Sequence, residues 1–282
     1  MIKSAPLISW VYALLILLFI IGLAVLFPSD KKVSLALERL ELNPKIQKHF
    51  RVAAVGTSLS GYGFYPDKKM QEEYAKREGK KIEFFRFWNP GRDLEIFDAL
   101  FERLKSSEIN LVLIEAKLLY YSNGDGFIPL NKVRNTVVNV IKSPFKVPAL
   151  DDETRVQEGF KRFGVEKKKK DYLEIARSKR YKREFKPTKK LDEFLLYAKQ
   201  NNVTVALVGL PFAQEVELLY PPELKVYEEE ILKQYKEKYN VRYISFEEKL
   251  NETYFGDLVH VNAKGRTSLS TWLISQIQGM SQ

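Results

Sequence analysis

The sequence predicts an α/β protein built as a three-layer sandwich around a central parallel sheet of about five strands. Two observations support this fold class: apolar runs alternate with amphipathic helical stretches along the chain, and these runs are rich in Val, Ile and Leu. Strands that are apolar on both faces and separated by helices are typical of parallel sheets with right-handed crossovers. The chain has 282 residues, 45% of them hydrophobic, so it can bury a full core.

The expected strands are the apolar runs at residues 51–56, 82–88, 109–115, 203–210 and 241–246. Helical patterns lie between them at residues 68–79, 93–106, 188–200, 222–239 and 263–278. We therefore expect a sheet domain at residues 51–282, preceded by a helical linker at residues 31–50. In such a sheet, ligands bind beyond the carboxyl ends of the strands.

The amino terminus contains an uncharged run of 21 residues, 7–27. A helix of that length is about 30 Å long, which matches the hydrocarbon core of a bilayer. We expect residues 1–30 to hold a retained transmembrane anchor, because the run exceeds the usual signal-peptide core and no clean small-x-small cleavage site follows; a cleaved secretory signal is the alternative. Charge does not decide the orientation, since Lys3 precedes the span while Lys31 and Lys32 follow it.

A basic insertion interrupts the alternation at about residues 120–187, where no strand is expected. Residues 161–190 hold 14 Lys and Arg against 4 Asp and Glu, an excess equal to the net charge of +10 of the whole chain. This segment is either a solvated face or a contact for anionic headgroups or a polyanionic polymer. The lysines expected to make that contact are Lys167, Lys168, Lys169 and Lys170. Nucleic acid is not an expected partner, because no nucleic-acid-binding motif accompanies the charge.

Metal-binding residue types are scarce in the chain. It has no cysteine, and its two histidines are His49 and His260. Disulfides and thiolate metal sites are therefore excluded, and a histidine-rich metal site is not expected. The prediction is a protein without a metal or another cofactor.

Two motifs far apart in the chain carry possible chemistry. Ser58 lies in "VAAVGTSLSG" (52–61), just after the first expected strand, and Asp257 and His260 lie in "GDLVHVNAKGR" (256–266), before the last helix. A serine hydroxyl becomes a useful nucleophile when an imidazole takes its proton, and the imidazole needs an acceptor on its other nitrogen. Alternatively, Gly-Thr-Ser is an ordinary turn and the histidine is structural.

These two motifs resemble the SGNH or GDSL hydrolases, whose first block is Gly-Asp-Ser-Leu after a strand and whose last block is Asp-x-x-His before the final helix. Here the blocks read Gly-Thr-Ser-Leu-Ser at 56–60 and Asp-Leu-Val-His at 257–260, and the resemblance covers roughly residues 50–278. It implies a flavodoxin-like SGNH hydrolase fold. It also implies that Ser58 is the nucleophile, His260 the general base and Asp257 the residue that orients the histidine.

The resemblance also indicates an oxyanion hole. The family's second block looks like "FWNPGRD", which implies that the backbone N–H groups of Gly91 and Ser58 bind the developing oxyanion. One departure from the family pattern is Thr57, which stands where the family usually has aspartate.

A second departure is the missing third block, Gly-x-Asn-Asp, after the strand at residues 109–115. The sequence there reads "EAKLLYYSNGDG", with Asn123 too far along to take the asparagine's place. Either Lys117 is the substitute oxyanion donor, or this donor is missing and the site is weaker. Glu115 is expected either to be a buried partner of a base such as Lys117 or to have a catalytic role.

An amino-terminal anchor combined with an inserted region is similar to the membrane-tethered branch of this superfamily, whose members help to acylate cell-surface polysaccharides or teichoic acids. That resemblance implies a single-pass protein of the cytoplasmic membrane with an extracytoplasmic catalytic domain, acting beside a multispanning membrane acyltransferase. The expected reaction is transfer of an acyl group, acetyl, through acyl-Ser58 to a hydroxyl of a cell-surface glycan. The alternatives are a carboxylesterase or deacetylase of the same fold and a catalytically silent polymer-binding adaptor.

Overall fold

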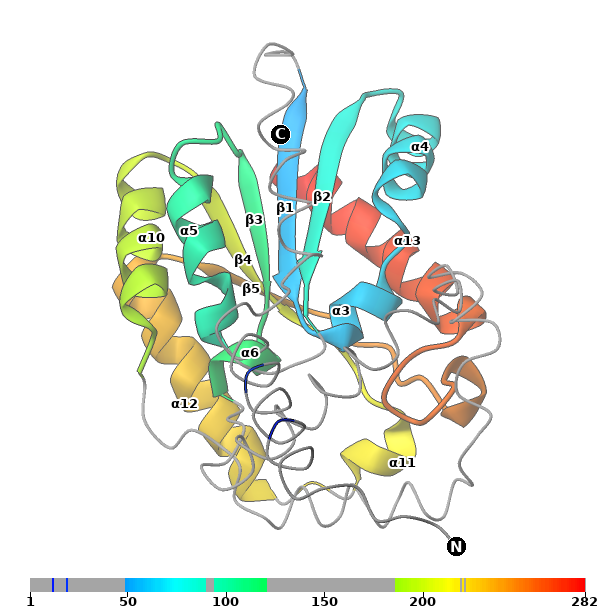
Figure 1. The fold of residues 1–282 in the computed structure, drawn as a ribbon. Helices are drawn as coiled ribbons and strands as arrows, with labels where there is room; N and C mark the ends of the chain where they lie inside the picture. The colour runs from blue at the N-terminus through cyan, green and yellow to red at the C-terminus, as the bar shows by residue number, and fades with distance from the viewer. Residues whose placement is uncertain are drawn as a thin grey trace, which may run out of the picture. The chain divides into compact units, whose positions relative to one another are not determined.

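Five parallel strands form one sheet in the order β2-β1-β3-β4-β5 (Figure 1). They are β1 (Phe50–Gly56), β2 (Ile82–Trp88), β3 (Leu111–Glu115), β4 (Thr204–Gly209) and β5 (Arg242–Ser245). The computed structural model describes residues 12, 19, 49–89, 94–120, 186–218, 220 and 222–281. The predicted α/β class with a central parallel sheet of five strands is confirmed, and its strand order is the flavodoxin-like one.

The strands alternate with helices, as the sequence predicted. The helices are α3 (Ser58–Gly63), α4 (Asp67–Glu78), η1 (Leu94–Phe97), α5 (Asp98–Leu104), α6 (Lys117–Tyr120), α10 (Lys189–Gln200), α11 (Gln214–Glu217), α12 (Pro222–Tyr239), η2 (Glu252–Tyr254) and α13 (Ala263–Met280). The helix expected at 93–106 is a 3-10 turn, η1, followed by the shorter α5. The short helices α3, α6 and α11 were not predicted.

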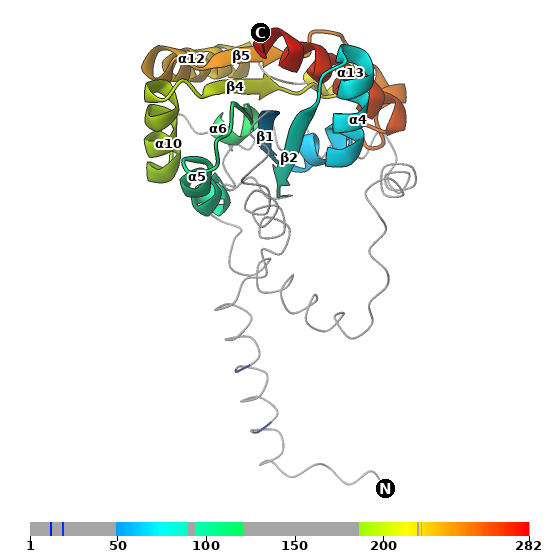
Figure 2. The same ribbon diagram turned by 90° about the horizontal axis from the view of Figure 1, so that it is seen from above.

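Two apolar layers sandwich the sheet. Along β1, Ala53 and Val55 pack into a cluster with α5, α10 and α12, while Val52 and Ala54 pack into a second cluster with α4 and α13. Helices α5 and α10 therefore cover one face, and α4 and α13 cover the other (Figures 1 and 2). This alternation follows from the strand geometry, since successive side chains point to opposite faces.

The edge strand β5 departs from the expectation of strands buried on both faces. Arg242 and Tyr243 are exposed, and among the described strands β5 pairs only with β4. A second, smaller difference is that β1 begins at Phe50, a residue assigned above to the linker.

The predicted anchor and insertion fall largely outside the described residues. Of residues 1–30, only Tyr12 and Phe19 are described, and they belong to a different compact unit from the sheet. Residues 31–48 and 121–185, which include Lys167, Lys168, Lys169, Lys170 and Asn123, are also outside the described part. Within the described part, the structure contains no helix with the length and apolar character needed to span a bilayer.

Candidate active site

Ser58 is the first residue of α3, one residue after Thr57 and two after the end of β1. Thr57 is the N-cap: its backbone is extended, and its hydroxyl accepts a hydrogen bond from the Leu59 N–H at 3.1 Å. An N-cap hydroxyl satisfies one of the N–H groups that the first turn of a helix leaves without an intrahelical partner. The turn thus places Ser58 at the carboxyl edge of the sheet, where α3 lies in Figure 1.

Two arginines hold the end of α3, a helix whose sequence, SLSGYG, has low intrinsic helix propensity. Arg86 donates to the carbonyls of Gly61 and Phe64 at 2.9 and 3.0 Å, and buried Arg266 donates to the Tyr62 carbonyl at 2.8 Å. Cationic donors at a helix carboxyl end satisfy its last carbonyls and suit its dipole. Tertiary contacts, rather than local sequence, therefore stabilise the helix that carries Ser58.

The loop before α13 carries the other two residues of the predicted triad. Gly256 N–H donates to the His260 carbonyl at 2.9 Å, and Ala213 N–H donates to the Leu258 carbonyl at 2.9 Å. Leu258 has φ of 70°, a left-handed conformation that is strained for a branched side chain. Asn262 then caps α13 by accepting from the N–H groups of Lys264 and Gly265. The loop thus has a defined shape at the point where His260 leaves it.

Ser58, His260 and Asp257 form a hydrogen-bonded chain. The Ser58 Oγ to His260 Nε2 distance is 2.8 Å, and the His260 Nδ1 to Asp257 Oδ2 distance is 2.9 Å. Because Asp257 Oδ2 faces Nδ1, the consistent tautomer carries its hydrogen on Nδ1 and leaves Nε2 to accept the Ser58 hydroxyl hydrogen. The structure therefore brings together the three residues that the two motifs predicted.

Asp257 is held firmly for its part in this chain. Its side chain is 5% exposed, against 18% for His260. Its second oxygen, Oδ1, accepts the backbone N–H groups of Val259 and His260 at 3.1 and 2.7 Å. Both carboxylate oxygens are thus engaged, which fixes the plane of the carboxylate and the direction of Oδ2.

Two aromatic side chains that the sequence did not predict as part of the site, Tyr62 and Trp88, lie beside His260. The Tyr62 ring meets the His260 ring edge-on, with centroids 5.5 Å apart at 89°, and lies 5.3 Å from the ring of Trp88. Trp88 is 8% exposed, and a Cβ at Gly61 would lie 2.3 Å from its ring. These contacts confine the imidazole from the side, and no pattern in the sequence distinguishes Tyr62 from the chain's other tyrosines.

One backbone N–H at the start of α3 is without an acceptor in the described part of the chain, that of Ser58. The Thr57 and Ser60 N–H groups donate to Glu115, the Leu59 N–H donates to the Thr57 hydroxyl, and the Gly61 N–H donates to the Thr57 carbonyl. The other predicted backbone donor, Gly91, lies outside the described residues.

Lys117 takes a different place from the one predicted. Its ammonium group donates to the Leu210 carbonyl at 2.7 Å and lies 3.0 Å from the centre of the Phe212 ring. It lines a cavity of about 280 Å³ whose lining includes neither Ser58 nor His260. The predicted oxyanion role of Lys117 therefore has no support in the geometry.

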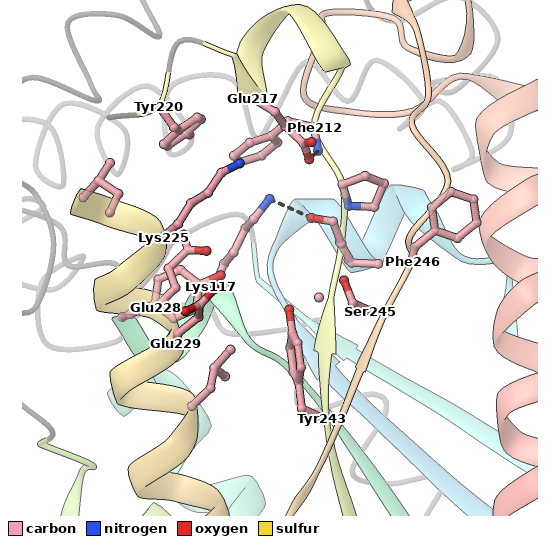
Figure 3. A pocket seen from close by; sticks show the side chains of 16 residues that line it. Lys117, Phe212, Glu217, Tyr220, Lys225, Glu228, Glu229, Tyr243, Ser245 and Phe246 are labelled. Atoms are coloured by element: carbon pink, nitrogen blue, oxygen red, sulfur yellow. Dashed lines mark hydrogen bonds between the residues drawn. The ribbon is translucent and has the colours of Figure 1, made fainter. Parts of the chain in front are cut away.

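The cavity beside Lys117 lies at the carboxyl ends of β3, β4 and β5. Figure 3 shows Lys117 reaching across it, with Glu228 and Glu229 on α12 and Tyr243 on β5. Burial raises the pKa of Glu228, an effect that the Lys117 ammonium opposes. The cavity thus lies at the same edge of the sheet as Ser58, with both apolar and charged side chains in its lining.

Glu115 also differs from the prediction. It is 2% exposed, and its carboxylate accepts three hydrogen bonds from Thr57 and Ser60 rather than pairing with Lys117. As for metals, the described residues contain no group of three or more His, Cys, Asp and Glu placed to hold an ion.

Comparison with protein families and with curated proteins gives no match. Among solved structures, the chain is similar to an esterase from Pseudoalteromonas sp., at 15% identity over 81% of this chain and 97% of that chain, with a TM-score of 0.42. It is similar to an acetyl xylan esterase from Geobacillus stearothermophilus, at 13% identity over 81% of this chain and 94% of that chain, with a TM-score of 0.42.

A third similar structure is an α/β hydrolase from the metagenome of Lake Arreo, Spain. It is 11% identical over 82% of this chain and 96% of that chain, with a TM-score of 0.41. Likeness at this level does not transfer an activity to this chain, so its function is inferred from the geometry around Ser58.

Proposed function

We propose that the protein is a serine-dependent enzyme that cleaves carboxylic esters through an acyl-Ser58 intermediate. The observation that carries this proposal is the continuous chain of hydrogen bonds from Ser58 Oγ through His260 to Asp257, with distances of 2.8 and 2.9 Å. Those contacts match what a hydroxyl nucleophile, its general base and an orienting carboxylate require.

The chemistry follows from the donors and acceptors present. His260 Nε2 takes the Ser58 hydroxyl proton as Oγ forms a bond to the ester carbon, and Asp257 stabilises the resulting imidazolium. The carbonyl oxygen becomes an anion that the Ser58 N–H is positioned to bind. Collapse of this intermediate breaks the bond to the alcohol, which leaves with the proton from His260. A hydroxyl compound then repeats these steps on acyl-Ser58, with His260 again as the base.

The compound that takes the acyl group from acyl-Ser58 decides between two activities. Water as acceptor makes the protein a carboxylesterase or deacetylase. We propose further that the acceptor is a hydroxyl of a cell-surface polysaccharide and that the acyl group is acetyl, which makes the protein an O-acetyltransferase. The uncharged residues 7–27 and the basic residues 161–190 support this extension, because they suit an extracytoplasmic domain anchored to the cytoplasmic membrane, acting on a polymer beside a multispanning acyltransferase.

A silent adaptor that only binds a polymer is the third candidate, and the geometry favours it least. Binding through the basic segment requires no alignment of a serine, a histidine and an aspartate. These three residues meet although 202 positions separate Ser58 from His260 in the chain.

Asp257→Asn tests the orienting role. An amide at this position can present an N–H to His260 Nδ1 and thereby favour the wrong tautomer, so we expect kcat for p-nitrophenyl acetate to fall by about 10³- to 10⁴-fold with the fold intact. Glu247→Gln is the control, because Glu247 is an exposed carboxylate in the loop after β5. Steady-state kinetics check the prediction, and a fall of less than about tenfold would argue against the proposed role of Asp257.

Reversing Lys167, Lys168, Lys169 and Lys170 to glutamate tests the proposed polymer or membrane contact. We expect weaker association with vesicles rich in anionic lipid or with an anionic polysaccharide, most clearly at low salt, since exposed charges are screened over about 8 Å at physiological ionic strength. Turnover of p-nitrophenyl acetate should stay unchanged, because a small neutral ester needs no electrostatic steering. Co-sedimentation at two salt concentrations measures the binding. Unchanged binding would indicate that the basic segment is only a solvated face of the protein.

A further inference from the structure

A buried carboxylate lies directly beneath the turn that carries Ser58. Glu115 is the last residue of β3 and is 2% exposed. Its Oε2 accepts the Thr57 N–H at 2.8 Å and the Ser60 N–H at 3.3 Å, and its Oε1 accepts the Thr57 hydroxyl at 2.7 Å. One side chain from a neighbouring strand thus engages the residues on both sides of Ser58.

All three contacts require an acceptor. A carboxylate has two oxygens and no hydrogen, so it can accept from two backbone N–H groups and a hydroxyl together. An amide in the same place would direct its NH₂ group at one of these donors. Because the site is buried, a donor that loses its acceptor there gains no compensating water. The three donors of the turn therefore require a carboxylate, and a polar side chain that carries its own donor does not satisfy all of them.

The contacts with Glu115 also determine which N–H groups of the turn point inward. Those of Thr57 and Ser60 face Glu115, and the Thr57 hydroxyl, while donating to Glu115, accepts from the Leu59 N–H at 3.1 Å. The Ser58 N–H lies between these bonds and has no acceptor in the described part of the chain. It is the donor assigned above to the oxyanion. Glu115 thus orients the backbone group that the reaction uses.

The close approach of Glu115 depends on the residue that ends β1. A Cβ at Gly56 would lie 2.7 Å from Glu115 Oε2 and 2.0 Å from Ser60 Oγ. Thr57 stands where the resembling family has an aspartate, so this chain lacks an acidic residue within the turn. Glu115 nevertheless brings a carboxylate to the turn from β3, the strand that pairs with β1.

We propose that Glu115 is a positioning residue for the reaction of Ser58, and that positions 57 and 115 form a pair in which one carboxylate is required and two are not tolerated. The inference rests on the proposed function, since it assigns Glu115 a part in the reactivity of Ser58. Glu115 acts through the turn and touches no reacting atom. Its effect is on kcat, because it aligns the Ser58 N–H and Oγ without contacting the substrate.

The test is an exchange of the carboxylate between the two positions. It compares the wild type with Glu115→Gln, Thr57→Asp and the double variant Thr57→Asp/Glu115→Gln. Glu115→Gln should lower kcat for p-nitrophenyl acetate by about 100-fold with KM little changed, the size of effect seen when one oxyanion donor is misplaced. Thr57→Asp should also lower kcat, because it places two carboxylates within hydrogen-bond distance of each other. The double variant should recover at least about tenfold over either single variant.

Glu83→Gln is the matched control. Glu83 is also a buried strand carboxylate, 8% exposed, but it pairs with Arg51 at 2.9 Å, near the start of β1 rather than at the turn after it. Its replacement should lower Tm and leave kcat unchanged. A purely structural Glu115 would behave the same way, so a parallel loss of Tm without a loss of kcat would overturn the proposal.

Two further outcomes are decisive. If the effects of the two single changes add in the double variant, with no recovery of kcat or Tm, the proposed pair is refuted. If the wild type shows neither turnover nor labelling by a fluorophosphonate, the proposed function fails instead. In that case the Tm values of the same four proteins still test whether positions 57 and 115 depend on each other. A higher Tm in the double variant than in either single variant would support this dependence, and its measurement needs no activity.

Discussion

Replacing Ser58 with alanine is expected to lower kcat/KM for p-nitrophenyl acetate by at least about 10³-fold, because the residue that forms the acyl bond is lost. His260→Ala should cause a loss of similar size, since without the imidazole at 2.8 Å the hydroxyl keeps its proton. Residues of a triad act as a unit, so the double variant should be little worse than either single one.

The other histidine provides the control for this experiment. His49 is partly buried at the opposite end of β1, beside Phe50 and Lys80, and His49→Ala should leave turnover unchanged. Circular dichroism establishes that each variant is folded before kinetics are compared. If folded Ser58→Ala keeps wild-type turnover, the esterase activity does not reside in this site.

Gly56→Ala should lower both stability and activity, because it changes the shape of the site rather than its reacting groups. The added methyl would lie 2.0 Å from Ser60 Oγ and 2.7 Å from Glu115 Oε2, so the turn or the carboxylate must move. Overpacking of this kind costs about 1–3 kcal/mol. We expect a lower Tm together with a fall in kcat of about 100-fold, the size of effect expected from a misplaced oxyanion donor.

Gly279→Ala separates this clash from the general effect of adding a methyl group. Gly279 lies in α13, and a Cβ there meets nothing within 4 Å. Gly279 is the second-to-last residue of α13, where alanine keeps part of the preference over glycine that amounts to about 0.5–1 kcal/mol in a helix interior. This variant should therefore be at least as stable as the wild type and fully active. Thermal melts and steady-state kinetics measure both. Wild-type activity in Gly56→Ala would contradict the packing around Ser58 described here.

The strands of the sheet were predictable because each one is a short apolar run bounded by polar residues. β2 has the predicted bounds, and β1 differs by one residue, Phe50. β5 differs from the prediction in its burial, because Arg242 and Tyr243 are exposed at the edge of the sheet. Its short run gives no signal for which strand lies at an edge, since strand order depends on contacts distant in sequence.

Helix α3 was not predictable for a different reason. Its glycines and serines favour turns, and it is held by Arg86 and Arg266, which come from β2 and α13. Such support is tertiary and leaves no local pattern. The same applies to Lys117: its position after β3 suggested a donor near Ser58, but the Leu210 carbonyl and the Phe212 ring bind it elsewhere.

The position of the candidate site was predictable from two motifs. The hydrogen bonds that hold the turn carrying Ser58 were not predictable. Ser58 and His260 each lie at the carboxyl edge of a parallel sheet, and that placement suggested that they meet. The three hydrogen bonds to Glu115 depend on the register of β1 and β3, in which Val55 pairs with Ile114. Register is not readable from one sequence of apolar runs. Of the two roles expected for Glu115, the pairing with Lys117 was therefore wrong, because its partners are Thr57 and Ser60.

The most direct test of the central claim is the covalent reaction of Ser58 itself. The purified protein would be treated with a fluorophosphonate, and the modified residue located by peptide mass spectrometry. We expect one phosphonyl group per chain on Ser58, no adduct in Ser58→Ala and much slower labelling in His260→Ala. A folded wild-type protein that stays unmodified, or an adduct that persists in Ser58→Ala, would contradict it.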